Sequence, residues 1–165
     1  MKLCTWLAGA ALAIAANAHA QDAPVTVSDV RVSADLTAVT SELAATYWGT
    51  LEGDLASAVA AEFVGRTAPG GVVVAIDIDE IALASFFDAT AGADDARLTG
   101  DVGLINAANE EVLRVFTVSA TANQAASYLP AGADVVMISP TSAEFYAAVV
   151  RAFARGVADT VKAGG

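Results

Sequence analysis

The sequence predicts an α+β domain, a two-layer sandwich in which two long helices pack on one face of a mostly antiparallel sheet of four or five strands. Three observations predict this fold. Apolar residues keep a two-residue period over 25–33 and 72–83, as in β-strands. They recur every three or four positions over 40–64 and 141–163, as in amphipathic helices. The region 98–119 has the pattern of a hairpin and completes the order strand, helix, strand, hairpin, helix.

The first strand and the first helix each carry an irregularity. Valines at 25, 27, 30 and 32 keep the strand period but slip by one residue near Ser28–Asp29, which predicts a bulge or a bend. Gly49 and Gly53 interrupt the helix, and each costs about 1 kcal/mol relative to alanine. They favour a break into two shorter helices or a kink; close approach of another backbone is the alternative. The apolar stripe of this helix comprises Leu43, Tyr47, Leu51, Leu55, Val59 and Phe63.

The second half of the chain contains the hairpin and the closing helix. Asn106–Asn109 predicts the turn of the hairpin. Thr141 and Glu144 fit a capping box at the start of the last helix. The core stripe of that helix comprises Phe145, Val149, Phe153, Val157 and Val161. The remaining segments are predicted as a loop at 85–96, an irregular stretch at 123–132 and a short buried strand at 135–138.

The first twenty residues have the pattern of a secretory signal peptide. Lys2 gives a positive start, residues 3–16 are apolar or small, and Ala18-His19-Ala20 has the small-x-small pattern of a cleavage site. The apolar run of about 14 residues is shorter than the roughly 20 that a membrane-spanning helix needs. We therefore expect cleavage, with retention as an anchor as the alternative. The mature protein would be one domain, residues 21–165, periplasmic or secreted and without a membrane span.

Cleavage would remove Cys4 and His19, the single cysteine and the single histidine of the chain. The mature domain would then lack disulfides, a Cys or His zinc site and the usual pairing of a nucleophile with a histidine base. Without Lys2, seven basic residues face 19 acidic ones, a net charge of −12. Such a charge makes nucleic acid and anionic membrane surfaces poor partners. We expect no cofactor, and only carboxylate chemistry remains open.

The densest acidic cluster is Asp77, Asp79 and Glu80, at the end of the second predicted strand. Residues two apart on a strand point to the same side, so these carboxylates are placed to share Ca²⁺ or Mg²⁺ or to act as an acid–base pair. A solvated strand face that hinders edge pairing is the plainer interpretation. A second acidic group predicts a surface loop, because its spacing is not that of an EF-hand. Its members are Asp88, Asp94, Asp95 and Asp101.

One face of the closing helix is basic. Arg151, Arg155 and Lys162 lie opposite its apolar stripe. A basic strip on an acidic body would be able to dock an acidic partner. A solvated face whose cations complement the negative end of the helix dipole is the alternative.

The order of elements resembles that of a group of small envelope domains. The features that carry the resemblance are the long helix after the first strand, the strand 72–83, the hairpin 98–119 and the closing helix from Thr141. The group is related to the amino-terminal domain of the Tol-system protein TolB and to the curli-secretion lipoprotein CsgG. The resemblance implies an envelope protein and covers most of the mature chain. Many members are lipoproteins, whereas here Cys4 precedes the apolar stretch instead of following it.

Two functional hypotheses follow. The first is an exported accessory or adaptor protein that acts through contacts with an envelope protein and carries no chemistry. The second is a divalent-metal-dependent hydrolase or metal-binding protein that uses Asp77, Asp79 and Glu80. The sequence leaves the partner and the oligomeric state open.

Overall fold

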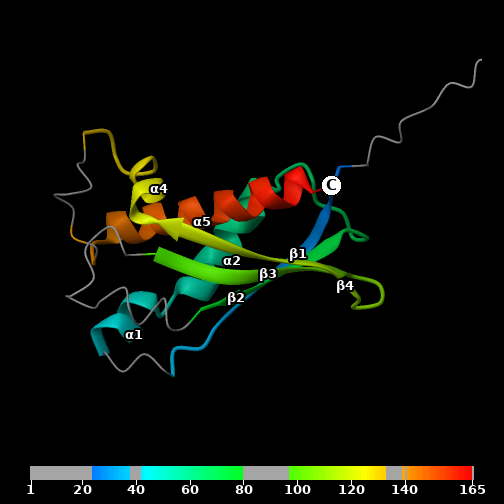
Figure 1. Cartoon of the computed structure of the whole chain (residues 1–165), viewed down its shortest axis with the longest axis horizontal. Coiled ribbons are helices and arrows are strands. Elements are labelled where there is room, and N and C mark those ends of the chain that lie inside the picture. Colours follow the sequence, from blue (N-terminus) through cyan, green and yellow to red (C-terminus); the bar gives the residue numbers. More distant parts are fainter. Residues whose placement is uncertain (1–23, 38–41, 80–96, 133–138, 140, 165) are drawn as a thin grey trace, which may run out of the picture.

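The strands that the structure describes form one mixed sheet of four (Figure 1). A computed structural model describes residues 24–37, 42–79, 97–132, 139 and 141–164. The strands, which pair in the order of the chain, are β1 (Val27–Ala34), β2 (Val72–Ile78), β3 (Arg97–Asn106) and β4 (Val112–Thr121). β1 pairs with β2 in parallel, and the pairs β2–β3 and β3–β4 are antiparallel. The α+β class and the four strands are confirmed. Two of the three strand pairs are antiparallel, as expected, and the β1–β2 pair is parallel because a helical crossover joins the two strands.

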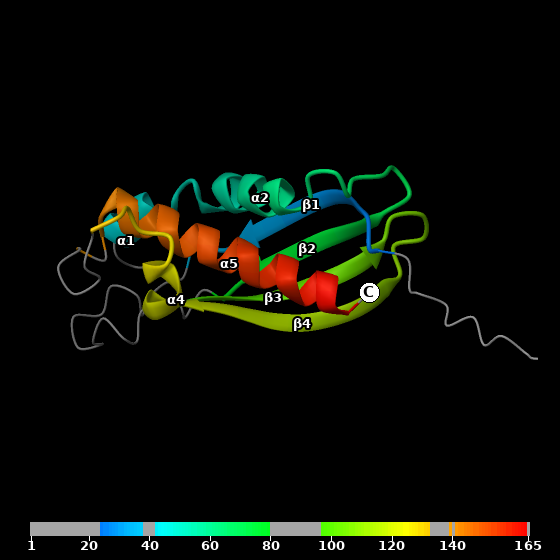
Figure 2. The same ribbon diagram turned by 90° about the horizontal axis from the view of Figure 1, so that it is seen from above.

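The two largest helices lie over one face of this sheet, as Figure 2 shows. The structure has four helices in its described part. They are α1 (Glu42–Trp48), α2 (Leu51–Glu62), α4 (Ala122–Ala126) and α5 (Ala143–Ala163). The predicted helix over 40–64 breaks at Gly49–Thr50, so α5 is the single long helix of the described residues. α2 packs beside β1, and α5 packs on β3 and β4. No helix in the described part of the chain is long and apolar enough to cross a bilayer.

The helices and strands were predicted better than the local features at their ends. The bulge in β1 is confirmed by a register shift between Val27 and Asp29. The cap of α5 is Ser142 and not Thr141, because the Ser142 hydroxyl accepts the Phe145 N–H at 3.1 Å. The stretch predicted as irregular contains the short helix α4, which begins with a capping box between Thr121 and Gln124. The loop 85–96 and the strand 135–138 lie outside the described residues.

The core lies between the helices and the facing side of the sheet, and the predicted stripe of α5 is buried completely or nearly so. Two glycines allow α5 to approach the sheet closely. A Cβ atom on Gly100 in β3 would lie 2.8 Å from the backbone oxygen of Asp77 and 3.3 Å from the ring of Phe153. A Cβ atom on Gly156 in α5 would lie 3.0 Å from a methyl carbon of Val118. A side chain larger than hydrogen at either position would therefore crowd this contact.

An aromatic cluster joins α1, α2 and α5. Tyr47 meets Trp48 and Tyr146 edge to face, with ring centres 4.7 Å and 5.3 Å apart. The Tyr146 hydroxyl donates to the Asp54 carboxylate at 2.8 Å. Burial raises the pKa of Tyr47, and burial is also the largest cause that raises the pKa of Tyr146 to about 12. Both phenols are therefore held neutral in the folded protein at pH values where an unfolded chain would ionise them.

Gly100→Ala is expected to lower the free energy of unfolding by about 1–3 kcal/mol, because the added methyl group would crowd the Asp77 backbone oxygen and the ring of Phe153. Gly53 in α2 is the matched control, since a Cβ atom there would meet no atom within 4 Å. Gly53→Ala should stabilise the protein by up to about 1 kcal/mol through helix propensity. Urea unfolding of both variants measures the difference. A Gly100→Ala protein as stable as the wild type would contradict the packing argument.

Stability should fall as pH rises above 10, the ordinary pKa of tyrosine, towards about 12, the raised pKa of Tyr146. In this range the unfolded chain loses phenolic protons that the folded protein keeps, and such a difference favours unfolding. The contribution is fully present below pH 10. Urea titrations between pH 9 and about 12 measure the slope. In the double variant Tyr47→Phe, Tyr146→Phe the slope should be shallower, and an unchanged slope would assign the loss to other groups.

Candidate functional site

A row of four polar side chains crosses the sheet on the face opposite to α2 and α5, here called the open face. Register places Ser33, Asp77, Asp101 and Thr117 next to one another, one from each strand. Ser33 donates to Asp77 at 2.9 Å, and Thr117 donates to Asp101 at 2.6 Å. All four side chains are exposed. The two central carboxylates are therefore neighbours, and each accepts a hydrogen bond from an outer strand.

Of the four residues in this row, the sequence indicated only Asp77 as a site residue, and Asp101 is the missed carboxylate. It was grouped with the acidic loop, whereas the structure pairs it directly with Asp77 across β2 and β3. The register of an antiparallel pair would have been needed to find it. Asp79 lies just beyond β2, and its backbone N–H donates to Thr99 at 2.9 Å. Asp77, Asp79 and Asp101 line a hollow of about 220 Å³.

The structure describes only two of the three residues of the predicted metal cluster, Asp77 and Asp79. Glu80 lies outside the described residues. In the part of the chain that is described, no group of three or more His, Cys, Asp or Glu side chains is arranged to hold a metal ion. The pair Asp77–Asp101 supplies carboxylate oxygens, which are the ligands that Ca²⁺ and Mg²⁺ prefer. The metal site therefore remains a prediction, which rests on the described carboxylates of Asp77, Asp79 and Asp101.

An apolar groove of about 370 Å³ adjoins the polar row on the open face. Its apolar lining includes Ala75, Gly103, Ile105, Val112 and Val115. Val112 is 56% exposed and Val115 is 63% exposed, and the neighbouring Leu113 is 54% exposed. These three residues, here called the β4 patch, are three of the four large apolar side chains that are strongly exposed among the described residues. Exposed apolar side chains gathered at one place are typical of an interaction surface.

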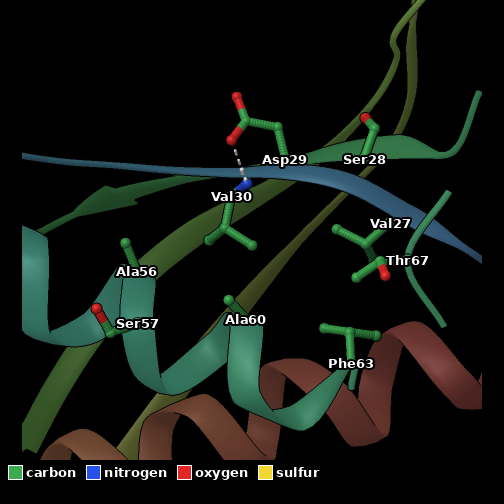
Figure 3. A pocket seen from close by; sticks show the side chains of 9 residues that line it. All are labelled: Val27, Ser28, Asp29, Val30, Ala56, Ser57, Ala60, Phe63 and Thr67. Atoms are coloured by element: carbon green, nitrogen blue, oxygen red, sulfur yellow. Dashed lines mark hydrogen bonds between the residues drawn. The ribbon is translucent and has the colours of Figure 1, made fainter. Parts of the chain in front are cut away.

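A second groove, of about 350 Å³, runs between the outer edge of β1 and α2 (Figure 3). Its helix side is formed by the small side chains of Ala56, Ser57 and Ala60, and the Val30 side chain points towards them. The Asp29 carboxylate accepts the Val30 N–H at 2.9 Å, as the dashed line marks, and also binds Arg31 at 3.0 Å. The polar group that this edge would offer to a ligand is therefore already occupied.

The predicted basic strip is partly used within the molecule. Arg155 lies 3.2 Å from Glu62 of α2 and 3.1 Å from Asp159, and Lys162 lies 3.8 Å from Glu62. Asp159 first and then Glu62 raise the pKa of Arg155. Arg151 is exposed and has no ion pair among the described residues. Docking of an acidic partner on this strip remains a prediction, and it would compete with ion pairs that join α2 to α5.

Comparison with known proteins assigns no family to the chain. No family model matches it, and no curated protein matches its sequence. Among solved structures, it is similar to a "putative lipoprotein" from Caulobacter crescentus CB15 with 13% sequence identity and a TM-score of 0.43. That match covers 82% of this chain and 89% of the other.

If Asp77 and Asp101 bind a divalent cation, calorimetric titration with CaCl₂ or MgCl₂ should give a saturable heat. Asp77→Asn and Asp101→Asn should each abolish this heat, because a pair of carboxylates cannot be shared after either is neutralised. Asp29→Asn is the control, since Asp29 lies on β1 and binds Arg31. Absence of heat in the wild-type protein at millimolar cation would contradict the metal hypothesis.

Proposed function

We propose that the protein is an exported envelope adaptor that binds another protein on the open face of its sheet. The observation that carries the proposal is the position of the β4 patch beside the row Ser33, Asp77, Asp101 and Thr117. No described helix packs on this face. The signal-peptide pattern of residues 1–20 supports export, and periplasm or medium is the expected location.

The two parts of the surface would contribute differently. Complete burial of a valine or leucine side chain contributes about 1.5–3 kcal/mol, so covering the half-exposed residues of the β4 patch provides the affinity. The Asp77 and Asp101 carboxylates provide orientation, because only a partner that brings cations or hydrogen-bond donors can cover them without loss. A partner segment that carries both apolar and basic side chains fits this combination.

The second candidate function, carboxylate-based metal binding or hydrolysis, has one observation in its favour. Asp101 is the register partner of Asp77, so two described carboxylates lie side by side on the open face. The two functions would use the same face and are separated by the calorimetric experiment above.

A photo-cross-linking residue at Ala75, on the floor of the apolar groove, should yield one adduct of constant mass in cells that export the protein. The same residue at Val64, which is 81% exposed outside the groove, should yield no such adduct. Ile105→Arg should abolish the Ala75 adduct, because it places a second long cation in the groove beside Arg31. Equal labelling from Ala75 and Val64, or an adduct that survives Ile105→Arg, would refute docking on the open face.

A further inference from the structure

The free edge of β4 presents unpaired backbone groups together with exposed apolar side chains. The Asp79 N–H bonds to the Thr99 oxygen, so the odd-numbered residues of β3 bond to β2 and the even-numbered residues bond to β4. In β4 the even-numbered residues from Arg114 to Ala120 therefore bond to β3. The N–H and C=O groups of Val115, Thr117 and Ser119 point away from the sheet. In the described residues no side chain bonds to the backbone of 112–120.

At the opposite edge of the sheet, by contrast, outward N–H groups of β1 are already hydrogen-bonded within the chain. On β1, Arg66 accepts the Val27 N–H, Asp29 accepts the Val30 N–H and Glu52 accepts the Ala34 N–H, each at 2.9 Å. Such contacts prevent another strand from pairing with an edge. β4 has no equivalent contacts among the described residues, and no aspartate, glutamate or proline occurs between 112 and 121. Among the described residues, the β1 edge therefore has three of its outward N–H groups bonded, whereas the β4 edge has a register shift at Leu113 and no such bond.

We propose that β4 pairs antiparallel with β4 of a second copy of this chain, with Val115 on the two-fold axis, so that two four-stranded sheets become one. This register joins outward-pointing groups at the axis, since Val115 faces Val115 of the second copy. Leu113, where the register of β3 with β4 shifts, lies opposite Thr117 of the second copy. It also places Arg114 opposite Phe116 of the second copy. Within one chain the Arg114 guanidinium already lies 5.3 Å from the centre of the Phe116 ring, and the pairing extends this cation–π contact.

Charge selects the register of this pair. β4 carries Arg114 as its single charge, although the whole chain has 19 acidic residues. A register centred on Arg114 would place two like charges opposite each other, which destabilises a strand pair. In the register centred on Val115, Glu111 lies opposite Ser119, so the two Glu111 carboxylates are about 27 Å apart, from eight residues at about 3.4 Å each. This separation exceeds the Debye length of about 8 Å in physiological salt.

The inference deepens the proposed function, because pairing would join the two open faces into one surface, but it can fail separately. Ala75→Arg alters the open face on β2 and leaves the β4 edge intact, so it should remove partner docking and keep the dimer. Val115→Pro removes an outward N–H from the edge, where proline is tolerated, and should remove the dimer.

The test is sedimentation velocity of the full chain over a range of concentrations. We expect a reversible dimer, since a contact limited to one strand pair is at the weak end of protein interfaces. Val115→Pro should weaken it about tenfold or more, because the two-fold axis doubles the effect of each lost hydrogen bond. Val115→Asp, which keeps the N–H, should do the same by opposing two carboxylates, and Val64→Asp is the control for an exposed valine outside the edge. A monomer at all concentrations, or a dimer unchanged by both Val115 variants, would overturn the proposal.

Cross-linking tests the register. In a chain carrying Cys4→Ser, so that no other cysteine is present, Val115→Cys should form a disulfide-linked dimer on mild oxidation. The Cα atoms of a directly opposed hydrogen-bonded pair lie about 5.5 Å apart, within the range of disulfides. Val64→Cys should remain monomeric. Equal cross-linking of both variants, or an adduct of Val115→Cys with a different protein, would refute pairing between two copies.

Discussion

Close packing of α5 against the sheet is the contact on which the rest of the structure depends. Phe153 lies over Gly100, and Gly156 lies over Val118, so helix and strands meet where one side has no side chain. The buried stripe from Phe145 to Val161 then fills the space along the helix. Because α5 and α2 cover one face of the sheet, the apolar residues of β2 and β3 are buried on that face. The other face is left without a described cover, and this determines where a partner can bind.

The two edges of the sheet have different surroundings for a reason that follows from this packing. α2 lies beside β1, so Glu52 of α2 reaches the edge of β1 and the segment 66–68 bonds to Val27. α5 packs on the face of β4, and no described side chain bonds to the outward N–H and C=O groups of this strand. The two edges of the sheet therefore differ in how many of their backbone groups are bonded by described residues. Binding by strand addition is therefore expected on β4 and disfavoured on β1.

Short-range periodicity predicted the elements, and long-range register decided the candidate site. The stripe of α5, the hairpin and the bulge near Ser28 depend on neighbours in sequence, and all three were predicted correctly. The parallel pairing of β1 and β2 depends on a crossover, and the contact between Asp77 and Asp101 depends on how β2 aligns with β3. The same limit applied to Arg155, because the periodicity of one helix does not show that Glu62 of another helix lies beside it.

The net negative charge of the chain limits the ways in which the β4 edge can pair with another copy. Exposed apolar strands tend to pair indiscriminately, and this tendency grows when net charge is small. With 19 acidic residues, two copies repel each other in most relative orientations. Attraction persists only where the carboxylates stay more than a Debye length apart and apolar groups meet, as in the register centred on Val115. Charge that opposes aggregation in general thus permits one specific contact, and the same balance favours a basic partner over an acidic one on the row of Asp77 and Asp101.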